Sequence, residues 1–228
     1  MITSTSNGQI KKIQQLLKKS RTRKEEGLFV AEGIKMFREA PPERIEKIYL
    51  GASFAEKGTW REILREKGLE EKAESLTEVV EDKVFKSLSD TVTPQGVLCL
   101  IRIKESTLEE MIPEEKPALL MILENLQDPG NLGTILRTGE GAGITGVILS
   151  KNSVDIYNPK VIRSTMGSVY RVPFCYTSSI QEEILPWLRE KKITGYAAHL
   201  EGKNSYDQED YTKATAFFIG NEGNGLSR

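Results

Sequence analysis

The residues best suited to chemistry lie in a polar loop that directly follows an apolar run. Residues 128–133, Asp-Pro-Gly-Asn-Leu-Gly, come after the apolar segment 118–123 and lead into a helical pattern that Asn131 opens. Asn131 and Arg137 are separated by less than two helical turns, so both side chains can face a crevice at the strand end. A guanidinium is always protonated and pairs well with phosphate. The alternative is that Asn131 only caps the helix and Arg137 is an ordinary surface cation.

A second polar loop has the same relation to an apolar strand. Residues 217–219 lead into 220–226, Gly-Asn-Glu-Gly-Asn-Gly-Leu, whose glycines let the backbone approach a ligand closely. Glu222 is the charged residue of this loop, and it could simply favour a helix N-terminus. A third loop, 198–204, follows another strand pattern.

Two glycine motifs are excluded as nucleotide-binding sites. Gly141, Gly143 and Gly146 match G-x-G-x-x-G, but here a helix ends at the glycines and a strand follows. A dinucleotide fingerprint needs the reverse order, because the pyrophosphate binds at a helix N-terminus. Gly202 and Lys203 lack the upstream glycine of a phosphate-binding loop.

Cysteine and histidine are too few for a metal or disulfide framework. The chain has two cysteines, Cys99 and Cys175, and one histidine, His199. No tightly bound metal is therefore expected. His199 could act as a general base, although a lone histidine at a strand end is more often structural.

Strand and helix patterns alternate through the second half of the chain. We expect strands at 118–123, 146–150, 169–174, 193–198 and 214–219, and helices at 132–142, 159–166 and 180–191. This alternation predicts a parallel sheet with helices on its faces. Ligands of such sheets bind beyond the carboxyl ends of the strands, where the three loops lie.

The first half of the chain mixes short strands and helices, so we expect a small α/β domain. The patterns predict strands at 28–31, 45–50 and 96–103 and helices at 34–39, 60–67 and 78–88. Ser6 and Gln9 form a capping-box pattern before a helix whose apolar side carries Ile10, Ile13, Leu16 and Leu17. The expected organisation is a first domain at 1–103, an acidic linker at 104–116 and a second domain at 117–228.

Positive charge is concentrated at the N-terminus. Seven of the 32 Lys and Arg residues lie within residues 1–24, which contain no acidic residue, so the remainder carries 25 basic and 33 acidic residues. An anionic partner such as RNA could bind there, and the alternative is a solvated helix face. The seven residues are Lys11, Lys12, Lys18, Lys19, Arg21, Arg23 and Lys24.

Length and composition favour a two-domain protein without membrane segments. The chain has 228 residues, of which 38% are hydrophobic and 29% charged, as in soluble globular proteins. No apolar run is long enough to span a membrane, and no signal-peptide pattern begins the chain. We expect a cytoplasmic protein.

Together, these segments resemble the SpoU (TrmH-type) RNA 2′-O-ribose methyltransferases of the SPOUT superfamily. Residues 125–138 are similar to the first family motif, 158–168 to the middle helix and 219–226 to the last motif. Residues 29–33, Phe-Val-Ala-Glu-Gly, and 93–97, Thr-Pro-Gln-Gly-Val, are similar to the N-terminal substrate-binding domain of the family. The resemblance covers essentially the whole chain.

This resemblance implies a fold, a reaction and a set of site residues. The fold is α/β: an L30e-like N-terminal RNA-binding domain and a C-terminal parallel-sheet domain with a trefoil knot. The reaction is S-adenosylmethionine-dependent methylation of a ribose 2′-hydroxyl, in rRNA rather than tRNA, by a homodimer without metal. Arg137 and Asn131 would be catalytic, with Glu222 orienting one of them, and Arg163 would join the N-terminal cations in binding RNA. The cofactor would contact Ala198, His199, Leu200, Gly220, Asn221, Gly223, Gly225 and Leu226.

One departure from the family pattern concerns the end of the sequence. The family continues past Gly-Leu-Ser with a strand, a Ser-Leu-Asn loop and a helix that complete the knot, the cofactor pocket and much of the dimer interface. This sequence stops at Arg228. The 228-residue chain is therefore expected to bind S-adenosylmethionine weakly or not at all. Two other hypotheses stay open: a catalytically inactive RNA-binding module of the same fold, and an unrelated nucleotide-binding enzyme.

Overall fold

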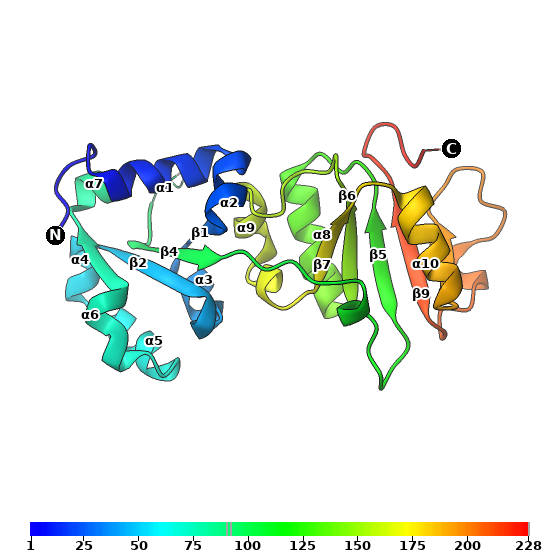
Figure 1. The fold of residues 1–228 in the computed structure, drawn as a ribbon, viewed down its shortest axis with the longest axis horizontal. Helices are drawn as coiled ribbons and strands as arrows, with labels where there is room; N and C mark the ends of the chain where they lie inside the picture. The colour runs from blue at the N-terminus through cyan, green and yellow to red at the C-terminus, as the bar shows by residue number, and fades with distance from the viewer. Residues whose placement is uncertain (90, 92, 228) are drawn as a thin grey trace. The chain divides into compact units, whose positions relative to one another are not determined.

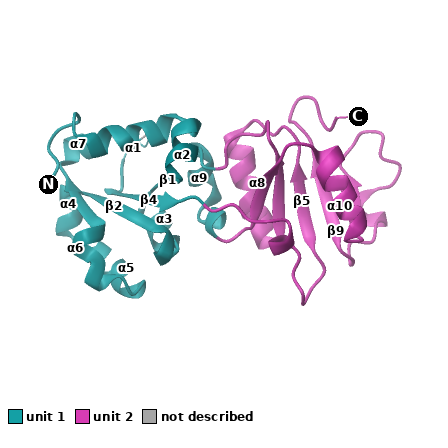
Figure 2. Cartoon of the chain, viewed as in Figure 1, with its two compact units in different colours: residues 1–103, 157–170 teal, residues 104–156, 171–228 magenta. Residues whose placement is uncertain are grey.

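The computed structural model describes residues 1–89, 91 and 93–227. The chain forms two compact units (Figure 2): unit 1 comprises residues 1–103 and 157–170, and unit 2 comprises residues 104–156 and 171–228. Residues 157–170, expected within the second domain, thus belong to unit 1. No helix among the described residues is long and apolar enough to cross a membrane.

Unit 1 contains a mixed four-stranded sheet. Its strands are β1 (Leu28–Glu32), β2 (Ile45–Gly51), β3 (Thr77–Val80) and β4 (Val97–Arg102), in the order β1-β4-β2-β3. Strand β4 is antiparallel to both β1 and β2, whereas β2 and β3 are parallel. The central position of β4 agrees with its sequence, because five of its six residues are buried.

Helix α1 (Gly8–Lys18) covers part of this sheet with its apolar side (Figure 1). Ile10, Ile13 and Leu16 are fully buried among residues of β1, β2 and β4. The capping box predicted at Ser6 is wrong: the side chain of Asn7 accepts the N–H of Gln9 at 2.8 Å and caps the helix. Asparagine suits this position as well as serine does.

The other helices of unit 1 are short. They are α2 (Ser20–Glu26), α3 (Ile34–Glu39), α4 (Ala52–Glu56), α5 (Thr59–Glu66), α6 (Ala73–Leu76), α7 (Asp82–Lys86) and α9 (Pro159–Thr165). Single 3₁₀ turns occur at Pro42–Arg44, Glu70–Lys72 and Ser168–Tyr170.

The helix predicted at 78–88 is wrong. Thr77–Val80 forms β3, which pairs with β2 from Ile48 to Gly51, and only Asp82–Lys86 is helical. The sequence of this segment has charges at helical spacing, which suggested the helix. Its β-branched residues pair with the free edge of β2 instead, and this strand pairing stabilises the segment more than a local helix would.

Unit 2 contains a five-stranded sheet in which every pair is parallel, as predicted. Its strands are β5 (Leu119–Leu123), β6 (Gly146–Ser150), β7 (Phe174–Thr177), β8 (Thr194–Ala197) and β9 (Thr215–Ile219). The order is β7-β6-β5-β9-β8. Strand β5 lies at the centre, and the chain continues to β6 on one side while β9 returns on the other. Such a reversal of strand order creates a crevice beyond the carboxyl ends of the strands.

Two helices accompany this sheet (Figure 1). Helix α8 (Pro129–Gly141) follows β5 and buries Leu132 and Leu136. Helix α10 (Leu185–Glu190) buries Trp187 and Leu188 against alternate residues of the strands, including Ile122 and Ala216.

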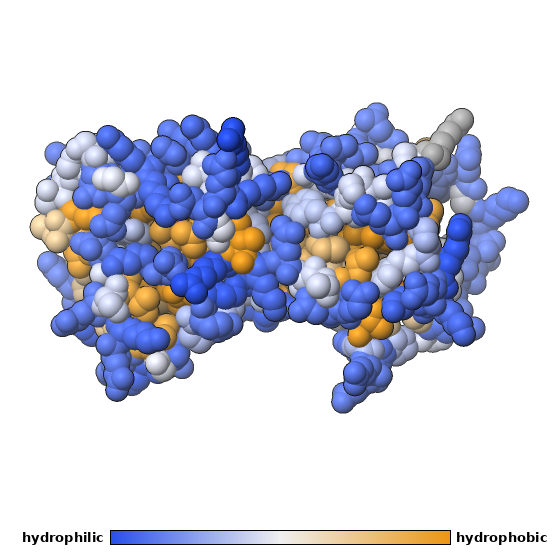
Figure 3. Space-filling model, in the orientation of Figure 1, coloured by the Kyte–Doolittle hydropathy of each residue, from blue (hydrophilic) through white to orange (hydrophobic). Residues whose placement is uncertain are grey.

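Hydrophilic side chains cover most of the face visible in Figure 3, with apolar groups between them.

Three expectations for unit 2 need correction. The strand expected at 169–174 begins instead at Phe174, and Ser168–Tyr170 is a 3₁₀ turn of unit 1. The helix expected at 180–191 starts as a π-helical turn, Ile180–Ile184, because Pro186 has no N–H for a regular helical bond. Residues 104–116 are more than a linker: Glu109–Met111 forms a 3₁₀ turn, and Met111 is fully buried in the core of unit 2.

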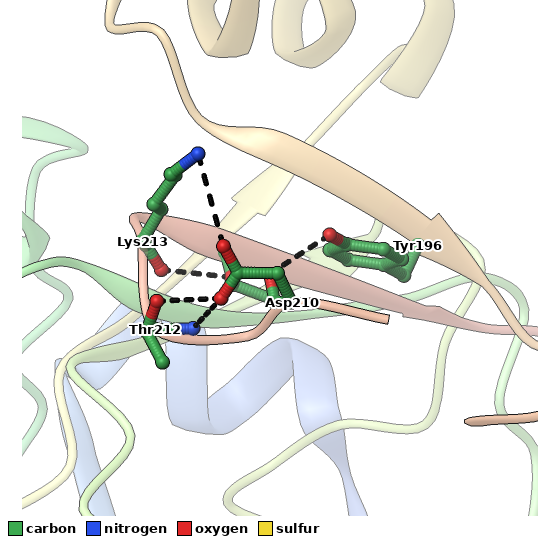
Figure 4. Close-up of polar contacts among 5 residues, drawn as sticks. Tyr196, Asp210, Thr212 and Lys213 are labelled. Atoms are coloured by element: carbon green, nitrogen blue, oxygen red, sulfur yellow. Dashed lines mark hydrogen bonds and ion pairs between the residues drawn. The ribbon is translucent and has the colours of Figure 1, made fainter. Parts of the chain in front are cut away.

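A polar network fixes the turn that leads into β9 (Figure 4). The carboxylate of Asp210 accepts the N–H and the hydroxyl of Thr212, and Lys213 Nζ lies 3.7 Å from it. Tyr196 of β8 donates its hydroxyl to the carbonyl of Asp210 at 3.0 Å. The hydrogen bonds from Thr212 lower the pKa of Asp210. This network ties the start of β9 to its neighbour β8.

Each glycine of the G-x-G-x-x-G match has a different place in the structure. Gly141 is the last residue of α8, Gly143 has φ of +78°, and Gly146 begins β6 against Met111. A Cβ on Gly146 would lie 2.4 Å from Met111 Cγ, whereas one on Gly141 would meet no atom within 4 Å. The prediction that these residues do not form a nucleotide fingerprint agrees with this geometry.

We expect Gly146→Ala to lower the free energy of unfolding by about 1–3 kcal/mol, because the new methyl group overpacks the site of Met111. Gly141→Ala should raise it by about 0.5–1 kcal/mol, since alanine is the better helix former. Urea denaturation of both variants measures the difference. Equal stability of the two variants would contradict the packing described for Met111.

Candidate functional site

The candidate site lies where the loops after β5 and β9 meet. These two strands are adjacent and parallel, with Leu123 paired to Ile219 at their carboxyl ends. The loop after β5 leads to α8, and the loop after β9 carries the glycine-rich segment. Sheet order therefore brings together two segments about ninety residues apart in the sequence.

Glu222 joins the two loops through three hydrogen bonds. Its Oε1 accepts the N–H of Asp128 at 3.0 Å and the side-chain amide of Asn131 at 3.2 Å. Its Oε2 accepts the N–H of Gln127 at 3.2 Å. Glu222 therefore contacts the side chain of Asn131, and its orienting role in catalysis stays a prediction.

These contacts keep Glu222 ionised. Partial burial by itself would raise the pKa of this carboxyl, but the hydrogen bonds from backbone N–H groups and Asn131 lower it to about 2. A carboxylate that accepts several N–H groups is strongly stabilised in its charged form. Glu222 is therefore a fixed negative acceptor rather than a proton donor at neutral pH.

Asp128, and not Asn131, caps α8. The side chain of Asp128 accepts the N–H of Asn131 at 2.8 Å, and Pro129 takes the first helical position. The alternative interpretation of Asn131 as the helix cap is therefore wrong. The amide nitrogen of Asn131 is bonded to Glu222, which leaves its Oδ1 available as an acceptor.

The loop after β9 is closed by its own hydrogen bonds. Asn221 and Gly225 exchange backbone hydrogen bonds of 3.0 and 2.9 Å, and Asn221 Oδ1 accepts the N–H groups of Gly223 and Asn224. Asn221 also donates its amide to the carbonyl of Asn125 at 2.9 Å. A Cβ on Gly220 would lie 2.1 Å from the carbonyl carbon of Gly225, so only glycine fits there.

Gln127 is a positioning residue that the sequence analysis missed. Its side-chain amide donates to the carbonyls of Asn152 at 2.7 Å and Asn125 at 3.2 Å. It therefore links the loops after β5 and β6, while its backbone N–H reaches Glu222. The sequence could have identified Gln127 by its place directly before Asp128, within the first family motif.

Arg137 is exposed on α8 and stands apart from the Glu222 contacts. Its side chain makes no hydrogen bond or ion pair within the described part of the chain. It lies about 9 Å further along the helix axis than Asn131, given the rise of 1.5 Å per residue. The structure thus brings Asn131 to Glu222 and leaves Arg137 open to a ligand.

The three predicted cofactor residues after β8 are exposed. The N–H of Ala198 bonds to the carbonyl of Phe218 at 3.2 Å, which continues the pairing of β8 with β9. His199 is not a buried structural histidine: its Nδ1 accepts the N–H of Glu201 at 3.2 Å on the surface. The Leu200 side chain is fully exposed.

Two pockets open near the carboxyl ends of the strands in unit 2. One of about 350 Å³ is mainly apolar and includes Ala197, Phe218 and Leu226. The other, of about 240 Å³, is polar and includes Asn125, Ser150 and Asn152. Of the predicted cofactor residues, only Leu226 lines either pocket.

The seven N-terminal cations have different environments. Arg23 is only 3% exposed and donates to the carbonyl of Leu16 at 2.6 Å, so it stabilises the end of α1 rather than offering its charge to a phosphate. Lys12 pairs with Glu26, and Arg21 pairs with Glu25. The residues that are exposed and form no ion pair within the described ranges are Lys11, Lys18, Lys19 and Lys24.

The cysteines and the acidic groups offer neither a reactive thiol nor a metal site in the described part of the chain. Burial raises the pKa of the Cys99 thiol and raises that of Cys175 to about 11, so both stay protonated at neutral pH. Among the described residues, no group of three or more His, Cys, Asp or Glu side chains could hold a metal ion. Arg163 is half-buried in unit 1.

The parallel sheet of unit 2, with polar loops at the carboxyl ends of β5 and β9, defines an α/β protein, and parallel sheets of this kind bind ligands at those strand ends. Comparison with known families gives the more specific assignment. Residues 118–228 match the SpoU rRNA Methylase family, and residues 7–99 match an MRM3-like substrate binding domain. The chain belongs to the SpoU rRNA methylase family.

Individual relatives agree with this assignment. An uncharacterised tRNA/rRNA methyltransferase of Synechocystis is 31% identical over 99% of this chain and 80% of its own length. The 23S rRNA (guanosine(2553)-2′-O)-methyltransferase of Bacillus subtilis is 29% identical, over 65% of this chain and 56% of its own length. The AdoMet-bound rRNA methyltransferase of Sinorhizobium meliloti is 29% identical with a TM-score of 0.83, over 99% of this chain and 82% of that chain.

We expect Glu222→Gln to lower the free energy of unfolding at pH 7 by about 1 kcal/mol, a value kept small because Glu222 is exposed. The pKa of Glu222 is lower in the folded protein, so its stabilisation is complete above the ordinary value of 4.5 and is lost as the pH falls toward about 2. Urea denaturation across this range should therefore show wild type and variant converging. Glu201→Gln is the matched control and should not differ from wild type at any pH. A constant difference between Glu222→Gln and wild type would refute the proposed ionisation.

Proposed function

We propose that this chain methylates a ribose 2′-hydroxyl of ribosomal RNA, with S-adenosylmethionine as the methyl donor. The observation that carries the proposal is the Glu222–Asn131 contact at the strand ends, with Arg137 exposed on the same helix as Asn131. Family membership and the names of the relatives support the reaction type. The AdoMet-bound neighbour supports the donor.

The residues at the strand ends fit such a donor. The loop 220–226 presents exposed backbone at Gly223 and Gly225, and the exposed segment 198–200 follows the adjacent strand. Backbone without side chains can approach a nucleoside closely. The donor, when bound, supplies a methyl group on a positively charged sulfur. Ala198, His199, Leu200, Gly220, Asn221 and Leu226 complete the set that we propose for its binding.

Arg137 would act on the RNA. A guanidinium stays protonated, so it binds a phosphate next to the target ribose and stabilises negative charge that develops on the 2′-oxygen. Asn131 is held by Glu222 through its amide nitrogen, so its free Oδ1 can accept a hydrogen bond from the 2′-hydroxyl or from Arg137. Correct placement of two reactants can contribute about 7–11 kcal/mol to catalysis.

The RNA would also contact unit 1, which contains the substrate-binding match and the unpaired N-terminal lysines. We propose rRNA rather than tRNA as the substrate, a homodimer as the active form and the cytoplasm as the location. Methylation mapping of both RNA classes after deletion of the gene tests the substrate, and analytical ultracentrifugation tests the dimer.

The alternative function is RNA binding without catalysis. It predicts RNA affinity but no binding of S-adenosylmethionine, so titration calorimetry with the donor, on this chain and on the protein from its complete gene, distinguishes the two functions.

We expect Arg137→Ala in the protein from its complete gene to reduce methyl transfer by at least about 10²-fold, as for loss of a charge-stabilising donor. Donor affinity should stay within a few fold, because Arg137 acts on the acceptor. Arg137→Lys should also fail, since an ammonium lacks the planar fork of the guanidinium. Arg189→Ala, an exposed arginine on α10, is the control and should be fully active. Substantial turnover by either Arg137 variant would remove Arg137 from the mechanism.

We expect replacement of Lys11, Lys18, Lys19 and Lys24 by alanine to weaken RNA binding for all sequences alike. Each phosphate contact that is lost should reduce the slope of log affinity against log salt by roughly 0.7–0.9. The double variant Lys12→Ala, Arg21→Ala should change the slope less, because Glu26 and Glu25 already neutralise these cations. Fluorescence anisotropy at several salt concentrations measures the slopes. An unchanged slope in the fourfold variant would identify α1 and α2 as an ordinary solvated surface.

A further inference from the structure

A pocket of about 340 Å³ in unit 1 has no role in the site described above. Three segments far apart in the sequence form it: the end of β1 with the start of α3, the segment before β4, and α9. Two of them are the Glu32–Gly33 and Thr93–Gln95 motifs of the sequence analysis. The lining residues are Glu32, Gly33, Lys35, Met36, Thr91, Thr93, Gln95, Arg163 and Met166.

The polar part of the pocket includes two basic side chains, Lys35 and Arg163. Lys35 is exposed and makes no ion pair among the described residues, and Arg163 lines the pocket from α9. The acidic residue, Glu32, has its carboxylate occupied by the hydroxyls of Ser89 and Thr91. The exposed ammonium of Lys35 and the guanidinium of Arg163, which has five N–H donors, can both contact one phosphodiester group.

The apolar part of the pocket consists of two methionines. Met36 is buried in α3, whereas Met166 follows α9 with 41% of its surface exposed, although it is a large hydrophobic residue. Met166 has φ of +51°, an unusual backbone conformation for such a side chain. Thioether side chains adapt to irregular partners and make favourable contacts with aromatic rings.

Gln95 adds a directed hydrogen-bond donor. Its Oε1 accepts the N–H of Ile34 at 2.7 Å, and a Cβ on Gly33 would lie 3.0 Å from this oxygen. With φ of +105°, Gly33 also has a backbone conformation that favours glycine. The amide nitrogen of Gln95 has no partner among the described residues, so its two N–H groups can be donated to a ligand.

We propose that this pocket binds one unpaired nucleotide of the RNA substrate, separate from the nucleotide that is methylated. Its phosphate would lie against Lys35 and Arg163, its base against Met36 and Met166, and a base edge would accept from Gln95. Bases in single-stranded RNA are free to stack on protein side chains and to hydrogen-bond through their edges. The volume is at the lower end of ligand pockets, which suits a single nucleotide. The identity of the ligand as RNA rests on the proposed function.

The methionines of this chain can serve as probes for the test. There are five of them: Met1, Met36, Met111, Met121 and Met166. In protein labelled with ¹³C on the methionine methyl groups, two probes line the pocket, while Met111 and Met121 belong to unit 2. Titration with a single-stranded RNA pentanucleotide, and separately with each nucleoside 5′-monophosphate, should shift the Met36 and Met166 signals. The RNA should do so at lower concentration, because neighbouring phosphates add to its affinity.

Variants connect the shifts to the pocket chemistry. Lys35→Glu should weaken the response to RNA by about tenfold, whereas Lys72→Glu, an exposed lysine of unit 1 outside the pocket, should change it little. Met166→Asn should also weaken it, since asparagine tolerates a positive φ but offers no apolar surface. A urea unfolding transition like that of the wild type, followed for unit 1, shows that each variant is folded.

Several results would overturn the inference. They are unshifted Met36 and Met166 signals with RNA, equal effects of the Lys35 and Lys72 variants, or tighter binding of a free mononucleotide than of the pentanucleotide. A separate titration with S-adenosylmethionine distinguishes this inference from the proposed function. If the protein from its complete gene binds no S-adenosylmethionine while RNA still shifts the Met36 and Met166 signals, the methyltransferase proposal is refuted and the pocket assignment stands.

Discussion

The carboxylate of Glu222 is the contact on which the candidate site depends. It accepts N–H groups from Gln127, Asp128 and Asn131, so one side chain of the loop after β9 fixes the start of α8. Charge-assisted hydrogen bonds of this kind are stronger than neutral ones. They form only because β9 returns beside β5 at the centre of the parallel sheet. Asn221 reinforces the same junction through the carbonyl of Asn125.

Some polar groups of this arrangement are held by hydrogen bonds within the protein, and others are exposed and can contact a ligand. Glu222 and the amide nitrogen of Asn131 satisfy each other, so they need little reorganisation when a ligand binds. Arg137 on α8 and four lysines of α1 and α2 keep exposed charges that can meet phosphate groups. The fixed part thus belongs to the sheet of unit 2, and the available charges occur in both units.

The sequence predicted the parallel sheet because its strands are short apolar runs separated by helical patterns, and β6 agrees residue for residue. The sequence was a poorer guide to segments whose structure depends on contacts with residues far away in the chain. The segment 77–80 became a strand because β2 offered a free edge, and Arg23 was counted as a surface cation although its guanidinium is buried against Leu16. The strand-end loops pointed to Asn131 and Glu222, and the family resemblance supplied the roles expected of them. Neither periodicity nor spacing could reveal that they touch, because that contact depends on strand order.

The most direct test of the account is the chemical identity of the product. Ribosomal RNA that has been incubated with the protein from its complete gene and with S-adenosylmethionine is digested to nucleosides and analysed by mass spectrometry. The site as described, with a guanidinium suited to phosphate and to charge on a 2′-oxygen and with an amide oxygen beside it, predicts a nucleoside methylated on its ribose 2′-oxygen. A methyl group on a base would contradict the account, and so would an RNA that gains no methyl group while the donor is bound.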